Sequence, residues 1–432
     1  MSWTIKAAIG VVAGVLLLSG CYWSQPGFGP DNQNSNPSVR DLGPARAATL
    51  HPVWSRSFTT EPTAPVESAG GRLHVAVNRP FDGFAGQSSV ETLDQRTGTT
   101  AWRYVEAAFG WYTELVEPVM VGSDLYVGYV GIHGGDFGKR YDPATGAIVE
   151  SDVAWGEASV RGSIVVRRAD ETVTDWFRYD LEIIDTSGAG RGWMVSNVSS
   201  VRPTSATVSD DAAFVVEGNR LGRYDYPLPA AGRAAECQPG SWEGAPPGFF
   251  GCDPLVNAVI AGVSAPVLST DQSTVYVTSP TAIHALDADD LSTKWTAAVP
   301  GGIVGPPTIA GDTLYVATGS SLTSMPVAGC GSATCTPSWS TALAGAAVDR
   351  PTVADGVVYV VSRPSDATDG DVLEAFDAEG ASGSPPILST PTGLAVKDSP
   401  VVTTRDRLFL TGSAVGVDPA GDEGRLVAYG PA

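Results

Sequence analysis

Short apolar runs separated by polar turns repeat along the chain from about residue 50 onward. Residues 265–295 show the pattern most clearly: a Pro-Val start, a polar turn, the runs Val275–Val277 and Ile283–Leu286, an acidic turn and a closing Trp295. Runs of β-branched and aromatic residues bounded by Pro, Asp, Ser and Gly are typical of short antiparallel strands. Each unit therefore predicts a small sheet of about four strands.

Eight such units follow one another. Seven begin at a proline, and residues 158–166 have the same pattern without one: Pro65, Pro118, Pro203, Pro266, Pro307, Pro351 and Pro400. Proline suits the first residue of a strand because no ladder N–H is needed there. Four-stranded units at a period of roughly 40 to 50 residues predict an all-β fold, an eight-bladed β-propeller with antiparallel blades.

The two ends of the chain carry complementary parts of one unit. The last unit stops at residues 425–430, before the Asp turn and Trp strand that complete other units. Val53–Phe58 is a Trp-containing strand with no hairpin before it. We therefore predict that the N- and C-terminal strands join in one blade and close the ring, which would also remove an exposed sheet edge.

An Asp turn precedes the Trp strand at the same spacing in three units, starting at Asp94, Asp185 and Asp287. Recurrence at one structural position favours a turn role, in which Asp accepts backbone N–H groups, over a catalytic or metal-binding role. The tryptophans are expected to be buried wedges between adjacent blades rather than ligand platforms. They are Trp54, Trp102, Trp193, Trp295 and Trp339.

Composition supports this fold and narrows the partners. The 432 residues include 50 Gly and 32 Pro, which break long helices, while 43% hydrophobic residues argue against disorder. A net charge of −21 should repel nucleic acid and anionic lipid head groups.

The N-terminus predicts export. Residues 1–20 are interpreted as a signal peptide, because the apolar run Ala7–Leu18 is too short to span a bilayer of ~30 Å. Residues Leu18–Cys21 read Leu-Ser-Gly-Cys and resemble a bacterial lipobox. The resemblance implies acyl chains on Cys21 and an anchor at the outer face of the cell membrane; an ordinary cleavage site with an incidental cysteine is the alternative.

Residues 21–49 are rich in Pro, Gly, Asn and Gln and contain no periodic apolar pattern. They predict a lipidated cysteine followed by a flexible tether. Residues 50–432 are then the propeller domain.

The other four cysteines form two local pairs, Cys237 with Cys252 and Cys330 with Cys335. Two short-range pairs fit disulfides in an oxidising compartment. A zinc site is the rival, although neither spacing is the Cys-x2-Cys that zinc usually takes.

Both pairs lie where a unit departs from the repeat. The extra residues of the sixth unit hold one pair, and the other pair brackets a Pro/Gly/aromatic loop in the fourth unit. Trp242, Phe249 and Phe250 make this second loop a candidate surface for a protein partner. A loop packed on the ring without a partner is the alternative.

The repeat Pro-Val, Gly-x-Leu-Tyr-Val, Leu-Asp-x-x-Thr-Gly, Trp resembles the quinoprotein-like (PQQ-like) propeller repeat over nearly all of the chain after residue 50. Together with the lipobox, it is similar to the BamB-like bacterial lipoproteins. The resemblance implies a fold but no activity, because this repeat serves both enzymes and scaffolds.

The dehydrogenases of this fold use pyrroloquinoline quinone (PQQ) with Ca²⁺, a catalytic Asp and often a Cys-Cys pair; no Cys-Cys dipeptide occurs in this sequence. Asp366, Asp369 and Asp371 could bind Ca²⁺ through oxygen ligands, with a solvated loop as the favoured alternative. His74 and His284 fall within strands, and no Gly-x-Ser-x-Gly or His-Glu-x-x-His motif is present. We therefore predict no catalytic residue, no metal site and no cofactor.

The leading hypothesis is a non-catalytic lipoprotein of the cell envelope that binds envelope proteins or assists their assembly. A PQQ-dependent dehydrogenase, or a sensor of a small ligand in the central channel, is the alternative. A binder of cell-wall glycan is a third, weaker hypothesis.

Overall fold

The structure is a computed structural model in which β-strands predominate. It describes residues 25–432 except 26, 61, 69, 79–87, 106–112, 116, 132–136, 154–157, 163, 174–175, 186–190, 197–205, 227–236, 240–249, 253, 398–400 and 417–423. Within these residues, α1 (Pro44–Ala47) is the helix, and no helix has the length and apolar character needed to cross a membrane.

The described strands form eight sheets, numbered here in chain order, and each predicted unit corresponds to one sheet. Sheet 1 contains β3 (Val66–Ser68), β4 (Arg72–Val77), β5 (Ser89–Asp94) and β6 (Thr100–Val105). Sheet 2 contains β7 (Thr113–Leu115), β8 (Val119–Val121), β9 (Asp124–Gly131), β10 (Phe137–Tyr141) and β11 (Ile148–Val153). Sheet 3 contains β12 (Ala158–Arg161), β13 (Ile164–Val173), β14 (Trp176–Asp185), β15 (Arg191–Ser196), β19 (Cys237–Pro239) and β20 (Phe250–Cys252). Sheet 4 contains β16 (Thr207–Val208), β17 (Ala212–Glu217), β18 (Arg220–Asp225) and β21 (Val256–Val259).

The second half continues the pattern. Sheet 5 contains β22 (Val267–Leu268), β23 (Thr274–Ser279), β24 (Ala282–Asp287), β25 (Thr293–Ala298) and β29 (Thr334–Cys335). Sheet 6 contains β26 (Ile303–Ala310), β27 (Thr313–Thr318), β28 (Ser321–Pro326) and β30 (Trp339–Ala342). Sheet 7 contains β1 (Ser35–Asn36), β31 (Ala346–Ala347), β32 (Thr352–Ala354), β33 (Val357–Arg363), β34 (Val372–Asp377) and β35 (Leu388–Pro391). Sheet 8 contains β2 (His51–Phe58), β36 (Leu394–Ala395), β37 (Val402–Thr403), β38 (Leu408–Ala414) and β39 (Gly424–Gly430).

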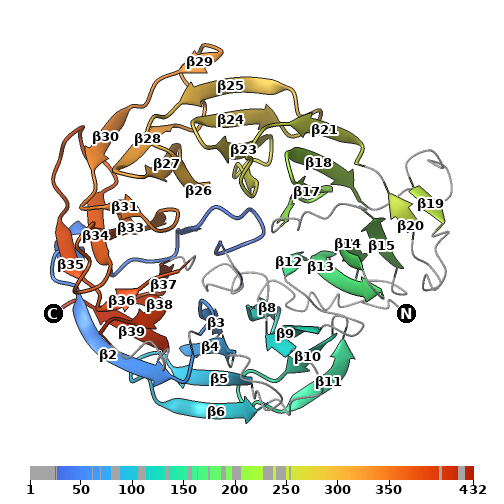
Figure 1. The fold of residues 1–432 in the computed structure, drawn as a ribbon, viewed down its shortest axis with the longest axis horizontal. Coiled ribbons are helices and arrows are strands. Elements are labelled where there is room, and N and C mark those ends of the chain that lie inside the picture. Colours follow the sequence, from blue (N-terminus) through green and yellow to red (C-terminus); the bar gives the residue numbers. More distant parts are fainter. Residues whose placement is uncertain are drawn as a thin grey trace, which may run out of the picture.

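The sheets follow one another around a common centre, with the strands that begin each repeat unit nearest that centre (Figure 1). In sheets 3 to 8 we call the strands closest to the centre the inner strands: β12, β16, β22, β26, β32 and β37. Each inner strand contacts the inner strand of the next sheet. The inner strands therefore form a continuous lining along this part of the molecule.

Burial explains why the middle strands are the most apolar. Every residue of β17 is buried, whereas β21 at the outer edge of the same sheet alternates between half-buried and exposed. The apolar clusters join neighbouring sheets, for example Val267 in sheet 5 with Leu314 in sheet 6. A strand covered on both faces reads as a continuous apolar run, while a strand at the rim alternates.

Strands from both ends of the chain share sheet 8. β2 pairs antiparallel with β39, and Trp54 lies opposite Ala428. The predicted pairing of Val53–Phe58 with the last unit is therefore observed, and it covers the outer side of β39.

Tryptophan side chains bridge adjacent sheets at the turns that follow the third strand. Trp54 in sheet 8 donates from Nε1 to the Gln95 carbonyl of sheet 1 at 3.0 Å. Trp102 in sheet 1 donates to the Pro143 carbonyl of sheet 2 at 2.9 Å. Both rings are half-buried and both indole N–H groups are bonded to the next sheet, so these tryptophans lie between adjacent sheets but, contrary to the expectation, are not fully buried.

The Asp turn provides the surface on which these rings rest. Asp94 Oδ1 accepts the backbone N–H groups of Arg96 and Thr97 at 3.1 and 2.9 Å. The turn ends at Gly98, which has φ +70°, and a Cβ at this position would lie 2.6 Å from the Trp54 ring. A glycine is thus required both by the backbone conformation and by the close approach of the ring.

We expect Gly146→Ala to lower the free energy of unfolding by about 2–4 kcal/mol, combining left-handed strain with overpacking. A Cβ at Gly146 would lie 2.5 Å from the Trp102 ring. Gly122→Ala is the matched control, since Gly122 has φ +60° and open space around it, and it should cost only about 1 kcal/mol. Urea denaturation of both variants measures the difference. Equal losses would contradict the docking role of the tryptophan.

His74 in β4 is a buried neutral side chain. Its Nδ1 lies 2.6 Å from the Thr92 hydroxyl and its Nε2 lies 2.7 Å from the Ser68 hydroxyl. Burial lowers the pKa of His74 from 6.5 to about 3, with a smaller contribution from Arg72. The histidine is therefore satisfied within its sheet, as its position in a strand predicts.

The lowered pKa makes stability depend on pH. The contribution of neutral His74 is fully present above pH 6.5 and declines as pH falls toward 3, by about 1.4 kcal/mol per pH unit. Urea denaturation at pH 7, 6 and 5 should show a shallower decline for His74→Gln than for the wild-type protein. His51→Gln, at an exposed position, should retain the wild-type slope. Parallel slopes for all three proteins would show that His74 does not contribute.

Candidate functional site

The structure describes some of the site residues predicted from the sequence and not others. Cys21, Trp242 and Phe249 lie outside the described residues. Phe250 belongs to β20 and Trp193 to β15, but the described part of the structure does not include their side chains. The lipidation of Cys21 and the proposed partner role of the aromatic loop remain predictions.

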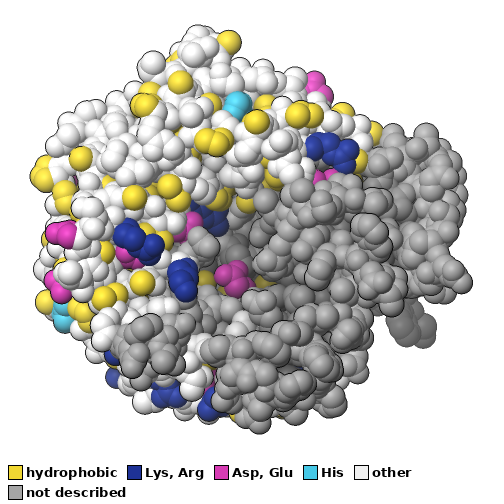
Figure 2. Space-filling view, viewed as in Figure 1, with side chains coloured by type: hydrophobic (Ala, Val, Ile, Leu, Met, Phe, Trp, Pro, Cys, Tyr) yellow, Lys and Arg dark blue, Asp and Glu magenta, His cyan; other side chains and the backbone are white. Residues whose placement is uncertain are grey.

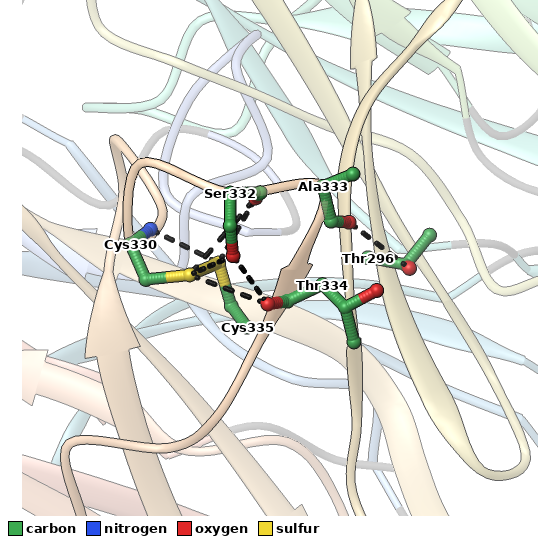
Figure 3. The surroundings of a disulfide bond; sticks show 6 residues. All are labelled: Thr296, Cys330, Ser332, Ala333, Thr334 and Cys335. Atoms are coloured by element: carbon green, nitrogen blue, oxygen red, sulfur yellow. Dashed lines mark hydrogen bonds between the residues drawn. A yellow bond between two sulfur atoms is a disulfide. The ribbon is translucent and has the colours of Figure 1, made fainter.

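Cys330 and Cys335 form a disulfide bond in the loop between β28 and β30 (Figure 3). The loop contains β29, which includes Cys335 and pairs in parallel with β25 of sheet 5. The Thr296 N–H donates to the Ala333 carbonyl at 2.9 Å, so the loop adds backbone bonds to the outer edge of the preceding sheet. The stapled loop of sheet 6 thus covers part of the edge of sheet 5.

The other cysteine pair lies in a similar arrangement. Cys237 in β19 lies directly opposite Cys252 in β20, and β20 pairs in parallel with β15 of sheet 3. Residues opposite one another in an antiparallel pair have Cα atoms roughly 4.5–5.5 Å apart, within the range that a disulfide spans. The register is therefore compatible with the predicted disulfide, which stays a prediction.

A groove of about 960 Å³ lies beneath the Cys330–Cys335 loop. Its polar lining includes Asp271 and Lys294. Lys294 Nζ donates to the Ser273 carbonyl at 2.8 Å and pairs with Asp287 at 3.1 Å. Its cation is therefore already engaged within sheet 5.

The segment predicted to be a flexible tether is instead part of the folded body. Residues 25–36, which we call the strap (residue 26 lies outside the described part), run through the centre of the molecule (Figure 1). Asn34 and Asn36 are 0% and 1% exposed. The tether prediction is therefore wrong for this segment, because its polar side chains form hydrogen bonds with the inner strands rather than with water.

The strap contacts the inner strands in their chain order, from sheet 3 to sheet 8. Gln25 bonds the backbone of Val160 in β12 through both its amide oxygen and its amide nitrogen. The backbone carbonyls that follow accept from one inner strand after another: Val208 N–H to Pro30, Leu268 N–H to Asp31, Ile309 N–H to Gln33 and Val353 N–H to Asn34, at 2.9–3.2 Å. One short segment thereby joins six sheets, counting the amide contact of Asn36 with sheet 8.

Asparagine amides add a second set of contacts. Nδ2 of Asn32, Asn34 and Asn36 donates to the carbonyls of Pro266, Pro351 and Thr403 at 2.9, 2.6 and 2.8 Å. Asn32 and Asn34 also have φ +55° and +53°, a left-handed conformation that Asn adopts more readily than most residues other than glycine. Asparagine therefore serves both the curvature of the strap and its attachment.

Arg350 clamps the strap from sheet 7. Its guanidinium donates to the Asn32 carbonyl at 2.9 Å and to Asn32 Oδ1 at 2.8 Å. Burial lowers the pKa of Arg350 to about 10, against the opposing effect of Asp349 and Glu117. The side chain remains charged at neutral pH, so both bonds to Asn32 are charge-assisted.

A second cation reaches the strap from sheet 3. Arg161 pairs with Asp31 at 2.7 Å and with Asp210 of sheet 4 at 2.6 Å. Burial raises the pKa of Asp31, and Arg161 offsets only part of this effect. Figure 2 shows basic and acidic side chains close to the hollow at the middle of this face.

Beyond the strap, the chain packs across sheets 7 and 8 before it enters β2. Val39, Leu42, Ala47 and Leu50 are buried in one apolar cluster with residues of both sheets. The Tyr359 hydroxyl of sheet 7 donates to the Leu42 carbonyl at 3.1 Å. Apolar contacts therefore fix the second half of the segment, whereas hydrogen bonds fix the first half.

The acidic loop that could hold Ca²⁺ is engaged in a different way. Asp371 is 1% exposed, and both of its oxygens bond Arg363, at 2.7 and 2.8 Å. The Val396 N–H also donates to Asp371 at 2.7 Å. The favoured interpretation of a solvated loop is thus wrong for Asp371. Among the described residues, no group of three or more His, Cys, Asp or Glu side chains is arranged to hold a metal ion.

Comparison with known proteins supports the predicted resemblance of the repeats. Residues 241–327 match the family described as outer membrane protein assembly factor BamB. A sequence search of curated proteins found no significant match.

Solved structures share the fold at low sequence identity. BamB from Moraxella catarrhalis is 14% identical, with a TM-score of 0.52, over 88% of this chain and 97% of that chain. The quinohemoprotein alcohol dehydrogenase from Comamonas testosteroni is 12% identical, with a TM-score of 0.62, over 95% of this chain and 80% of that chain. A second such dehydrogenase, from Pseudomonas putida HK5, is 11% identical, with a TM-score of 0.62, over 96% and 80%. The recognition of a quinoprotein-like propeller repeat is confirmed, and these likenesses concern the fold alone.

We expect Arg350→Ala to lower the free energy of unfolding by about 3 kcal/mol, because two buried oxygens of Asn32 lose charged donors. Hydrogen exchange at Leu268 and Ile309, whose N–H groups bond the strap, should also accelerate. Arg405→Ala is the matched control: Arg405 is 84% exposed and pairs with Asp41 at the surface, so its loss should cost less than about 1 kcal/mol. Similar effects of the two substitutions would contradict the clamp.

Proposed function

We propose that this chain is a non-catalytic scaffold of the cell envelope, built as a closed eight-bladed propeller and anchored through Cys21. The observation that carries the proposal is the strap, which commits the inner strands of six sheets to the chain's own residues. A protein whose centre is occupied in this way has its outer strands and inserted loops left for recognition. The BamB-like match over residues 241–327 agrees with a role in envelope assembly.

The composition of sheet 8 supports the proposed closure of the ring. The sheet takes β2 from the N-terminal side and β36–β39 from the C-terminal side of the chain. The Trp54 side chain then links sheet 8 to sheet 1 through the Gln95 carbonyl. Closure by shared strands removes free edges and holds the first and last blades together.

The anchor would lie close to the ring. Gln25 lies four positions after Cys21, and a fully extended chain spans at most roughly 14 Å over four positions. Gln25 is bonded to β12 of sheet 3. A lipid on Cys21 would therefore hold the ring close to the membrane surface rather than at the end of a long flexible linker.

The alternative, a PQQ-dependent dehydrogenase or a small-ligand sensor, needs free groups at the centre. Asn32 and Arg350 bond each other there, and the Leu268 and Ile309 N–H groups bond strap carbonyls. The chain's own residues thus occupy groups that a central ligand would use. This arrangement does not fit a cofactor at the centre unless the strap leaves, so we derive no chemistry through one.

The partner surface that we propose is the loop between Cys237 and Cys252, inserted between β18 and β21 of sheet 4, which contains Trp242, Phe249 and Phe250. Its flanking strands are attached to the outer edge of sheet 3 through β20. Aromatic side chains on such a loop suit a protein partner, because they supply large contact area at low entropic cost.

The anchor is tested by Cys21→Ala, which should move the protein from the membrane fraction to the soluble fraction while leaving its thermal unfolding unchanged. A double variant, Cys330→Ala with Cys335→Ala, controls for cysteine loss and should remain in the membrane fraction. In-cell crosslinking of the wild type should capture envelope proteins at residues 237–252. Retention of Cys21→Ala in the membrane fraction would overturn the anchor.

The dehydrogenase alternative is tested on the same purified protein with added PQQ and Ca²⁺. We expect no saturable quinone uptake and no dye reduction with alcohols, because the strap holds the centre. Saturable uptake together with dye reduction would reject the scaffold proposal.

A further inference from the structure

The repeat presents the same backbone donor to the centre in successive sheets. Leu268, Ile309 and Val353 each lie two residues after the proline that starts their unit, and each donates its N–H to a strap carbonyl. Val208 in β16 likewise donates its N–H, to the Pro30 carbonyl. This periodic row of backbone donors belongs to the repeat itself. Along the strap, an acceptor carbonyl for the next inner strand follows after every one or two residues.

Selectivity comes from the carbonyls that lie beside these donors. Asn32 and Asn34 donate their amides to the carbonyls of Pro266 and Pro351. A carboxylate in place of either amide would bring an acceptor against an acceptor inside a buried site, so Asp would be rejected where Asn is accepted. Arg350 adds to this selectivity by donating hydrogen bonds to the carbonyl and Oδ1 of Asn32.

The strap is held in a way that allows exchange. Its contacts with the inner strands are mainly hydrogen bonds, each of which contributes little net free energy because water can replace it, whereas the apolar anchors Val39 and Leu42 come after it. Asn34 Oδ1 is buried and has no donor in the described structure, which weakens the attachment of the strap. The match between strap and ring is therefore good but incomplete.

We propose that the centre of the ring is a peptide-binding site for tightly curved, amide-rich segments, and that residues 25–36 fill it in cis. The ligand class is a peptide with Asn at alternate positions, of which two take positive φ, and with backbone carbonyls directed at the inner strands. Covalent attachment gives the strap a high effective concentration, so a free peptide competes only when the strap is weakened. This proposal rests on the strap contacts and is independent of the envelope role.

The test uses the full chain carrying Asn32→Ala, Asn34→Ala and Asn36→Ala, and a fluorescein-labelled synthetic peptide of residues 25–38. The triple variant should bind this peptide saturably and at least tenfold more tightly than the wild-type chain does. The same peptide with Asn34→Asp should bind the variant at least tenfold more weakly. A chain with Asn257→Ala, an exposed position on β21, should behave as the wild type.

Equal binding of the peptide and a scrambled version by a folded triple variant would overturn the proposal. If the triple variant does not fold, Asn34→Ala alone is examined by hydrogen exchange. The N–H groups of Leu268, Ile309 and Val353 should exchange faster in this variant, and added peptide should restore their protection. Faster exchange that the peptide does not reverse would also overturn it. Membrane fractionation is unaffected by either result, so the two proposals fail separately.

Discussion

The inner strands impose the constraint on which the rest of the structure depends. A strand at the edge of a sheet leaves a row of backbone N–H and C=O groups without partners in its own sheet, and buried groups of this kind must be paired. Here the strap bonds the inner strands of sheets 3 to 8, through donors such as Leu268 and Ile309. The polar composition of residues 25–36 follows directly, because a backbone edge needs polar partners rather than apolar ones.

The outer rim meets the same constraint with different means. β2 covers β39, β29 extends β25, and β20 extends β15. In two of these cases the covering strand comes from a cysteine-containing loop of the next sheet, inserted between its third and fourth strands. Between centre and rim, tryptophan rings such as Trp102 fix one sheet on the next. Sheet 3 is thus tied to sheet 4, and sheet 5 to sheet 6, both at the centre through the strap and at the rim through the inserted loop.

The repeating part of this fold was predictable because its signals are local. Proline starts, Gly turns and Asp turns mark the strands, and the incomplete units at the two ends predict the β2–β39 pairing. The strap was missed because its partners lie 130 to more than 300 residues away in sequence, as between Asn34 and Pro351. One signal could have found it: asparagines at 32, 34 and 36 occupy alternate positions, a period that a disordered tether has no reason to keep.

The strap also changes what a lipid on Cys21 would do mechanically. A free tether would let the ring tilt and rotate at the membrane, and a pull on the lipid would load only the first strand. With the strap in place, such a pull is distributed over hydrogen bonds to the inner strands of six sheets, and the apolar anchors Val39 and Leu42 resist next. The same contacts that fill the centre would therefore set the orientation of the ring relative to a lipid on Cys21. If both proposals hold, binding at the centre and attachment to the membrane are coupled, because a peptide that displaced the strap would also lengthen the link between lipid and ring.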